Sequence, residues 1–264
     1  MIKLEVQNTN KVFLDRKREI KALDNINLKI EDNEFAVIVG PSGCGKSTLL
    51  NIIAGLEPAT SGEIVMDGKF IKGPGADRGM VFQSYTLFPW LTVQKNVEFG
   101  LTIKGISKKQ REQISFHYLQ MVKLENFAHL YPKSLSGGMK QRVAIARALA
   151  NQPDVLLMDE PFGALDAQTR VVMQELLLKI WEESQKTIIF ITHDIDEAIF
   201  LADKIYVMTR LPGRIKQEIK VDLPRPRDHQ IMVTPEFMDL KKQVVELIWE
   251  ESKAAAEEVF LNVM

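Results

Sequence analysis

The sequence predicts an α/β fold built on a mostly parallel, doubly wound sheet, and three observations support this. An unbroken apolar run at 35–40, and the mainly apolar segments at 154–160 and 186–193, have the character of strands buried on both faces. Each run leads into a segment with helical apolar spacing. The glycine-rich turn GPSGCGKST, at 40–48, joins the first of these strands to its helix. Strands that alternate with helices in this way are typical of a parallel sheet covered by helices.

The elements before and after these runs are predicted in order along the chain. The first thirty residues are expected to form strands, since INLKI at 26–30 alternates apolar and polar residues as a half-buried antiparallel strand does. The helix after the glycine-rich turn is expected to stop near Gly55. The segment EIVMDGKFI at 63–71 predicts a hairpin around its Asp-Gly pair, and RGMVFQ at 78–83 predicts a further short strand.

The second half begins with a helical stretch from Leu87 to about Ala150, in which 111–123 and 139–150 carry helical apolar spacing. DKIYVM at 203–208 and RIKQEIKVDL at 214–223 are predicted to be the last strands.

A proline-broken segment, DLPRPRD at 222–228, is predicted to be a linker, and a helical tail is expected from Glu236 to Val259. The chain is therefore expected to consist of a main domain at 1–228 and a C-terminal helical extension at 229–264.

Composition excludes several classes of protein. The 264 residues are 45% hydrophobic and 26% charged, as in an ordinary soluble globular protein. The net charge of −1 leaves no basic footprint for nucleic acid. A single cysteine, Cys44, rules out an intrachain disulfide and predicts a reducing, cytosolic compartment. The sequence has neither the apolar region of a signal peptide nor an apolar run of membrane-spanning length, so any work at a membrane needs another chain to span it.

The turn at 40–48 matches G-x-x-x-x-G-K-[ST] between a strand and a helix. Its glycines let backbone N–H groups converge on phosphate oxygens, and the helix N-terminus adds the positive end of its dipole. Lys46 is expected to reach the β- and γ-phosphates, Ser47 to ligate Mg²⁺ and Thr48 to contact the α-phosphate. The alternative is a glycine turn of structural role only. The predicted ATP-binding residues of this loop are Gly40, Pro41, Ser42, Gly43, Cys44, Gly45, Lys46, Ser47 and Thr48.

Polar residues follow two further buried strands, at the carboxyl edge where a parallel sheet binds its ligands. Asp159 is expected to hold Mg²⁺ and Glu160 to act as general base toward the attacking water. The alternative for this pair is the start of a solvated loop. His193 is expected beside the γ-phosphate, and the alternative is a histidine that only connects a strand to a helix.

A second glycine pair lies in LSGGMKQR at 135–142. Ser136 is a plausible helix N-cap, and Gly137 and Gly138 allow close backbone approach. The helix at 139–150 then supplies its dipole. The segment therefore predicts a second anion-binding site.

Together these motifs resemble the nucleotide-binding subunit of ATP-binding cassette (ABC) transporters, over nearly the whole chain to about Asp228. GPSGCGKST resembles the Walker A motif, VLLMDE resembles Walker B with its catalytic glutamate, and LSGGMKQR resembles the family signature. The resemblance implies a P-loop NTPase (RecA-like) core with an N-terminal antiparallel β subdomain and a helical subdomain at about 87–150, the ABC ATPase fold. It also implies ATP hydrolysis coupled to transmembrane transport.

The resemblance also implies individual roles. Gln83 matches the Q-loop glutamine that touches Mg²⁺ and the attacking water, and His193 matches the switch histidine. Asp166 belongs to the D-loop, which here is GALD, with glycine where serine is more usual. Phe13 falls where the family places an aromatic side chain against adenine, although a core aromatic is the alternative. In the family's head-to-tail dimer, ATP also meets the signature of the partner, which implies contacts in trans from Ser136, Gly137, Gly138 and Gln141.

Four segments resemble the importer branch that serves nitrate, sulfonate, taurine and bicarbonate: GPGADRGMVFQ, LFPWLTVQKNV, RLPGRI and DLPRPRD. The resemblance implies a second ATPase subunit, identical or closely homologous, separate permease subunits, an extracytoplasmic solute-binding protein and a peripheral place on the cytoplasmic face of the membrane. Nitrate or sulfonate/taurine is favoured as the solute, with bicarbonate possible. The alternatives are a non-transport ABC ATPase and a nucleotide-gated interaction module.

Large side chains after the Q-loop are expected to contact the permease, because clustered aromatic anchors are typical of interface hot spots. The alternative is that they pack the boundary between the core sheet and the helical subdomain. These residues are Tyr85, Leu87, Phe88 and Trp90.

Overall fold

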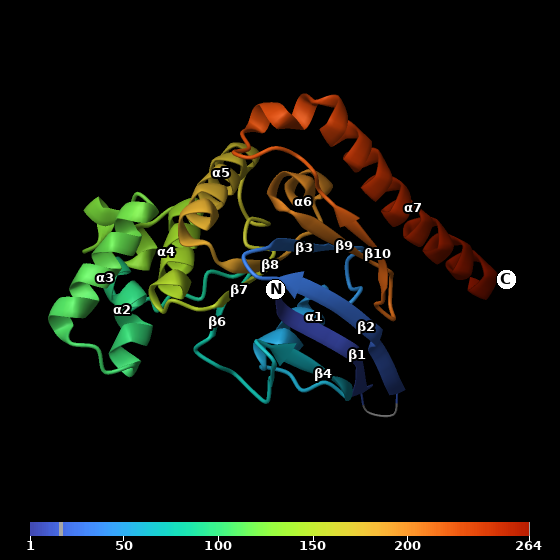
Figure 1. Cartoon of the computed structure of the whole chain (residues 1–264), viewed down its shortest axis with the longest axis horizontal. Helices are drawn as coiled ribbons and strands as arrows, with labels where there is room; N and C mark the ends of the chain where they lie inside the picture. Colours follow the sequence, from blue (N-terminus) through green and yellow to red (C-terminus); the bar gives the residue numbers. More distant parts are fainter. Residues whose placement is uncertain (16–17, 264) are drawn as a thin grey trace. The chain divides into compact units, whose positions relative to one another are not determined.

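The computed structural model describes residues 1–15 and 18–263 and forms two compact units (Figure 1). The first unit comprises Met1–Gly75 together with Thr187–Met264, and the second comprises Ala76–Lys186. The predicted C-terminal extension falls in the first unit, and its last residue, Met264, lies outside the described residues.

The first unit begins with an antiparallel sheet of order β2-β1-β4-β5. Its strands are β1 (Ile2–Asp15), β2 (Arg18–Glu31), β4 (Ser61–Met66) and β5 (Lys69–Phe70). Ile26, Leu28 and Ile30 are buried while Asn27 and Lys29 are exposed, which confirms the half-buried strand predicted at 26–30. The last two strands form the predicted hairpin.

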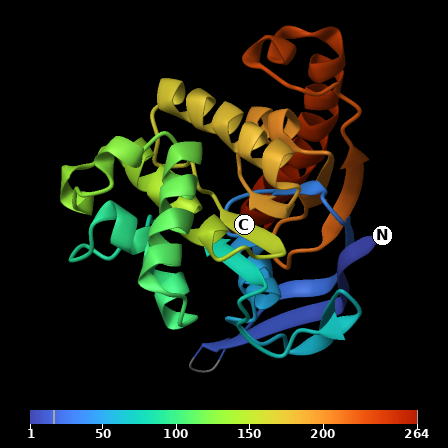
Figure 2. The ribbon, with the colours of Figure 1, turned by 60° about the vertical axis from the view of Figure 1, so that its left-hand side comes forward.

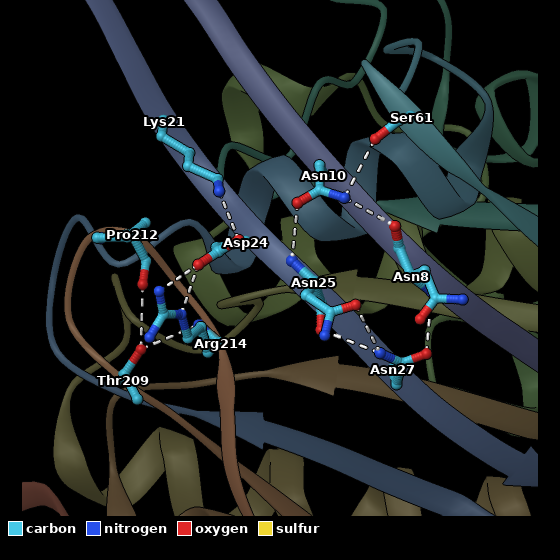
Figure 3. A network of polar contacts seen from close by, with 10 residues as sticks. All are labelled: Asn8, Asn10, Lys21, Asp24, Asn25, Asn27, Ser61, Thr209, Pro212 and Arg214. Atoms are coloured by element: carbon cyan, nitrogen blue, oxygen red, sulfur yellow. Dashed lines mark hydrogen bonds and ion pairs between the residues drawn. The ribbon is translucent and has the colours of Figure 1, made fainter.

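Asparagine side chains complete the hydrogen bonding where β1 and β2 lose their regular register (Figure 3). Asn8 and Asn25 have φ of 46° and 51°, the left-handed region that asparagine tolerates. The Oδ1 atom of Asn10 accepts from the N–H of Asn25, and that of Asn27 accepts from the N–H of Asn8, each at 2.9 Å. These amides replace the ladder bonds that the irregular register removes.

A second sheet in this unit carries the glycine-rich loop. β3 (Phe35–Val39) pairs in parallel with both β8 (Thr187–Ile191) and β9 (Lys204–Met208), and β10 (Ile215–Lys220) pairs antiparallel with β9. Every residue of β3 and β8 is buried, which confirms the prediction from their apolar runs. Helix α1 (Lys46–Ala54) follows β3, and α6 (Ile195–Leu201) follows β8.

The second unit combines a pair of parallel strands with helices. β6 (Arg78–Val81) pairs with β7 (Val155–Asp159). The helices are α2 (Val93–Ile103), α3 (Lys108–Met121), α4 (Gly137–Ala150) and α5 (Ala167–Ser184), with short 3₁₀ turns η1 (Glu125–Phe127) and η2 (Pro132–Ser134). The first three helices pack on one another (Figure 2). The predicted helices at 111–123 and 139–150 are α3 and α4, each beginning two or three residues earlier than expected.

The chain ends in a 3₁₀ turn, η3 (His229–Val233), and a long helix, α7 (Pro235–Val263). The helix packs on α6 and β9 and buries Phe237 and Val244, and it extends beyond the tail predicted at 236–259. Within residues 1–15 and 18–263, no helix has both the length and the apolar character that a bilayer crossing requires.

The segment at 222–228 is not the free linker that its prolines suggest. Arg227 is buried, with 6% of its surface exposed. Its Nη1 donates to the carbonyls of Ile199, Phe200 and Ala202 at 3.3, 3.0 and 2.7 Å, and its Nη2 donates to those of Val221 and Leu223 at 3.4 and 3.2 Å. The guanidinium therefore satisfies carbonyls at the C-terminus of α6, where a cation also complements the helix dipole.

We predict that Arg227→Ala lowers the free energy of unfolding by roughly 2–4 kcal/mol, because several buried carbonyls lose their donor. Chemical denaturation measures the change. Lys220→Ala is the control, since both side chains of its ion pair with Asp222 are exposed and the change should leave the unfolding midpoint nearly the same. Equal unfolding midpoints for Arg227→Ala and the unmodified chain would contradict the anchoring role.

Candidate functional site

The loop between β3 and α1 has glycines in the left-handed backbone region, which other residues rarely adopt. Gly43 and Gly45 have φ of 75° and 102°. A Cβ atom on Gly45 would lie 2.9 Å from the carbonyl oxygen of Ala22, so only glycine fits there. The Nζ atom of Lys46 donates to the carbonyls of Gly40 and Pro41 at 2.9 and 3.0 Å. The ammonium group is thereby held within the loop, where it can meet a phosphate.

Cys44 lies inside the same loop and is 1% exposed. Burial raises the pKa of its thiol, although the nearby Lys46 ammonium opposes this shift. The thiol is therefore protonated at neutral pH and poorly nucleophilic. This agrees with a spacer role in the loop.

The register of β3 against β8 places His193 at the edge of the sheet from which the loop emerges. Ile38 pairs with Ile191, so Gly40 and His193 each follow a paired residue by two positions. The N–H of Thr192 extends this pairing by donating to the carbonyl of Ile38 at 3.3 Å. The His193 side chain is exposed. The first unit thus brings together two of the sequence-predicted features, the glycine-rich loop and His193.

Phe13 lies on β1 with 37% of its surface exposed, so the core-aromatic alternative does not hold. The Nζ atom of Lys11 lies 4.8 Å from the centroid of its ring. That ammonium is itself buried and bonds to Glu57 at 2.5 Å and to the carbonyl of Pro58 at 2.7 Å. An exposed ring backed by a fixed cation is suited to stacking on a flat heterocycle.

The second unit gathers Gln83, Asp159 and Glu160. Val81 of β6 pairs with Met158 of β7, so Gln83 and Glu160 each lie two residues beyond a paired position. Gln83 and Asp159 line one hollow of about 540 Å³. A Cβ atom on Gly163 would lie 3.8 Å from Glu160 Oε2 and 3.9 Å from Gln83 Nε2, so both side chains reach the same point.

The same unit contains the second glycine pair, at the start of α4. The Oγ atom of Ser136 accepts from the N–H of Met139 at 3.3 Å, which confirms the predicted N-cap. A Cβ atom on Gly138 would lie 2.7 Å from Cγ2 of Thr169, and one on Gly137 would lie 2.9 Å from Oη of Tyr85. The glycines therefore permit close packing by the chain's own side chains, a role that the sequence does not reveal.

Asp166 caps the next helix, α5, by accepting from the N–H of Thr169 at 3.0 Å. Hydrogen bonds from Thr169 lower the pKa of Asp166 below its usual value. The carboxylate is exposed and stays ionised at neutral pH.

Gln141 does not fit its predicted contact with a nucleotide in trans. Its side chain is fully buried in α4. Neither amide atom has a hydrogen-bond partner within the described part of the chain. A side chain enclosed by its own subunit cannot reach a ligand on another, so the prediction of a contact in trans is wrong for Gln141.

The aromatic segment after Gln83 is fixed by two side chains that sequence reasoning missed. Asn96, fully buried in α2, accepts from the N–H of Phe88 at 2.8 Å and donates to its carbonyl at 3.1 Å. Arg147 of α4 donates to the carbonyl of Thr86 at 2.7 Å. An isolated asparagine or arginine in a helix gives no sequence signal that its side chain holds the backbone of a distant loop.

The predicted permease-contact residues lie in different surroundings. Trp90 is 71% exposed, with its ring centroid 5.6 Å from that of Phe88. Phe88 lines a hollow of about 570 Å³ together with Phe99 and Ile103. Tyr85 is half-buried against Gly137, and Leu87 is half-buried. Phe88 and Trp90 are thus the members that present aromatic surface beside a mainly apolar hollow.

Comparison with known proteins gives independent evidence on the family to which the chain is related. The family model described as "ABC transporter" matches residues 23–163. The chain is 51% identical to the nitrate import ATP-binding protein of Synechocystis, over 96% of this chain and 99% of that protein. It is 46% identical to an aliphatic sulfonates import ATP-binding protein of Bacillus cereus, over 92% and 94%. A solved dimeric ATP-binding cassette, in a post-hydrolysis state with ADP and Pi, is 39% identical with a TM-score of 0.74, over 84% of this chain and 100% of its own.

We predict that Gly137→Ala destabilises the protein through Tyr85 and that Tyr85→Phe relieves the defect, because the new methyl group would lie 2.9 Å from the tyrosine oxygen. Unfolding free energies of the two single variants and the double variant should give a coupling of about 0.5–2 kcal/mol. Gly73→Ala serves as control, because a Cβ atom there has no neighbour within 4 Å and should show no coupling to Tyr85→Phe. Strict additivity at Gly137 would contradict the contact.

Proposed function

Because the chain belongs to the ABC transporter family and is an ATPase of that family, we propose that it powers an importer for a small anion, with nitrate or an organic sulfonate such as taurine favoured and bicarbonate possible. The observation that carries the proposal is the glycine-rich loop with Lys46 held inside it. The choice of anion rests on the two import relatives, because the solute does not touch the ATPase.

The first unit supplies groups suited to binding ATP. The loop N–H groups and the N-terminus of α1 favour phosphate, and Lys46 adds a full positive charge. Phe13, exposed and backed by Lys11, is proposed to stack on adenine. His193 emerges beside the loop and is proposed to contact the γ-phosphate.

The second unit supplies groups suited to hydrolysis. Glu160 is proposed to take a proton from the attacking water, and Gln83 to orient that water. The oxygen donors of Asp159 and Gln83 are of the kind that Mg²⁺ prefers, and Mg²⁺ binds few protein ligands beside phosphates and water. Ser47 of the first unit is proposed as a further ligand. Bound Mg²⁺ neutralises charge on the β- and γ-phosphates.

A second ATPase subunit, identical or closely homologous, is proposed to complete the site. Ser136, Gly137 and Gly138 lie at the N-terminus of α4, where N–H groups and the dipole favour an anion. They are proposed to contact ATP held by the partner. Asp166 is proposed to lie near the interface between the two subunits. The solved cassette with ADP and Pi is dimeric, which supports this arrangement.

Permease subunits are proposed to dock on the second unit beside Phe88 and Trp90. The hollow there is mainly apolar, and its aromatic wall is held rigid by Asn96 and Arg147. A rigid aromatic anchor loses little conformational entropy on binding.

The chain would then lie peripherally on the cytoplasmic face of the membrane, and a solute-binding protein would deliver the anion on the other side. The nearly full-length match to import proteins supports this over a non-transport ATPase or an interaction module without turnover.

We predict that Glu160→Gln retains ATP binding but lowers turnover by roughly 10²–10⁴-fold, the usual contribution of a general base. Nucleotide titration and phosphate release measure the two quantities separately. Glu112→Gln, a change at a half-buried residue on α3, should leave both unchanged. Rapid hydrolysis by Glu160→Gln would remove Glu160 from its proposed role.

We predict that a strain lacking this gene fails to grow on nitrate as sole nitrogen source or on a sulfonate as sole sulfur source, and that the intact gene restores growth. The double variant Phe88→Ala/Trp90→Ala should not restore growth, although the purified protein still hydrolyses ATP, because only docking is lost.

The matched control for the double variant is Phe116→Ala, which removes another exposed aromatic side chain, on α3, with 45% of its surface exposed. Growth of the deletion strain on every nitrogen and sulfur source would refute the favoured solutes. Full restoration by the Phe88→Ala/Trp90→Ala chain would refute the docking surface alone.

A further inference from the structure

A turn between β9 and β10 lies directly behind the phosphate-binding loop. A Cβ atom on Gly213 would lie 2.2 Å from the carbonyl oxygen of Cys44, so the two backbones are in contact. The N–H of Gly213 donates to the carbonyl of Ala22 at 2.9 Å, and its carbonyl accepts from the N–H of Asp24 at the same distance. The same Ala22 carbonyl abuts Gly45. The back of the loop is thus packed by β2 and by this turn.

The turn is itself well fixed on the side of β2 (Figure 3). Within it, the hydroxyl of Thr209 accepts from the N–H of Arg214 at 2.9 Å. The Nε atom of Arg214 donates to Asp24 at 2.6 Å, and Lys21 pairs with the same carboxylate at 2.5 Å. These contacts tie one end of the turn to the strand that also supports the loop.

The other end of the turn is tied to the C-terminal helix α7, which passes beside β9 and β10 (Figure 1). The Oε2 atom of Glu251 accepts from the N–H of Arg210 at 3.1 Å, and its Oε1 atom pairs with Lys216 at 2.8 Å. Lys216 also donates to the carbonyl of Leu247 at 3.1 Å and to Glu250 at 2.9 Å. The Glu251 side chain is only 15% exposed, so this contact is sheltered from solvent.

The charges in this contact support one another. Burial alone would raise the pKa of Glu251, but hydrogen bonds from Lys216 and from the N–H of Arg210 outweigh it and lower that pKa. The pKa of Lys216 is raised by the same carboxylates, against the effect of burial. Both groups therefore stay charged at neutral pH, and the hydrogen bonds are charge-assisted.

We propose that Glu251 is a positioning residue for ATP binding: through Arg210 it holds the 209–214 turn against Cys44, so that α7 helps to set the shape of the phosphate-binding loop. A loop whose N–H groups already converge binds phosphate without a further ordering cost. Without the Glu251 contact, the turn is held at one end only, and ATP must order the loop as it binds. Glu251 has no role in hydrolysis, so its loss acts on affinity and not on the rate at saturation.

The test is ATP titration and steady-state hydrolysis with the purified full-length chain. Glu251→Ala should raise the Kd and the KM for ATP by roughly 3- to 10-fold, the size of the net contribution of one ordinary hydrogen bond, and leave kcat unchanged. Glu251→Gln keeps an oxygen that can accept from the N–H of Arg210 and should recover much of the affinity. Lys241→Met is the control, because it breaks the contact of α7 with Asp196 of α6 and leaves the turn untouched.

Unchanged ATP affinity in Glu251→Ala would overturn the proposal. Equal loss of affinity in Lys241→Met would also overturn it, since α7 would then act only through the general stability of the unit. Should Glu251→Ala not fold, Glu251→Met keeps a side chain of similar length and removes the oxygens that accept from Arg210, and an unchanged Kd in that variant would count against the proposal. The readout needs neither a permease nor a solute, so its failure is distinguishable from failure of the importer function.

Discussion

The parallel pairing of β3 with β8 and β9 is the constraint that places the glycine-rich loop and His193 at one edge of the sheet in the first unit. Ile38 pairs with Ile191, and Val39 pairs with Val207, so three chain segments leave the sheet at one edge. A slip of one residue would move the glycine-rich loop about 3.3 Å along the strand relative to His193. It would also reverse the facing of every β3 side chain, and all of them are fully buried. Apolar packing of the strand therefore fixes the chemistry at its end.

In the second unit, too, parallel strand pairing determines where the candidate site residues lie. The pairing of Val81 with Met158 sets Gln83 and Glu160 at equal distances beyond their strands, before any loop contributes. The loop that follows Gln83 is then fastened to two helices, by Asn96 of α2 and by Arg147 of α4. In both units, strand register sets which residues follow the end of each strand, and polar side chains then fix the conformation of the loops that carry these residues. Loops held in this way present their groups with little entropy left to lose.

Features with a local cause were predictable from the sequence. The buried strands follow from unbroken apolar runs, and the N-cap at Ser136 follows from its place before a helix. Features with partners distant in sequence were not. Arg227 lies in a segment whose prolines indicate a linker, yet three of its carbonyl partners are 25 to 28 residues away in sequence. Tyr85 lies in a segment predicted to contact the permease, yet its hydroxyl lies against Gly137 of the same chain. Gln141 shares the signature segment with Ser136 but faces inward.

The burial of Cys44 has a practical consequence for biophysical work. It is the single cysteine of the 264 residues, it is 1% exposed, and its protonated thiol reacts slowly with electrophiles. The native chain is therefore close to a cysteine-free background for maleimide chemistry. A cysteine introduced at an exposed site, such as Phe116 of α3, can carry a fluorophore while the nucleotide loop keeps its native residue. Two copies labelled in this way would report the distance between subunits by energy transfer during the ATP cycle.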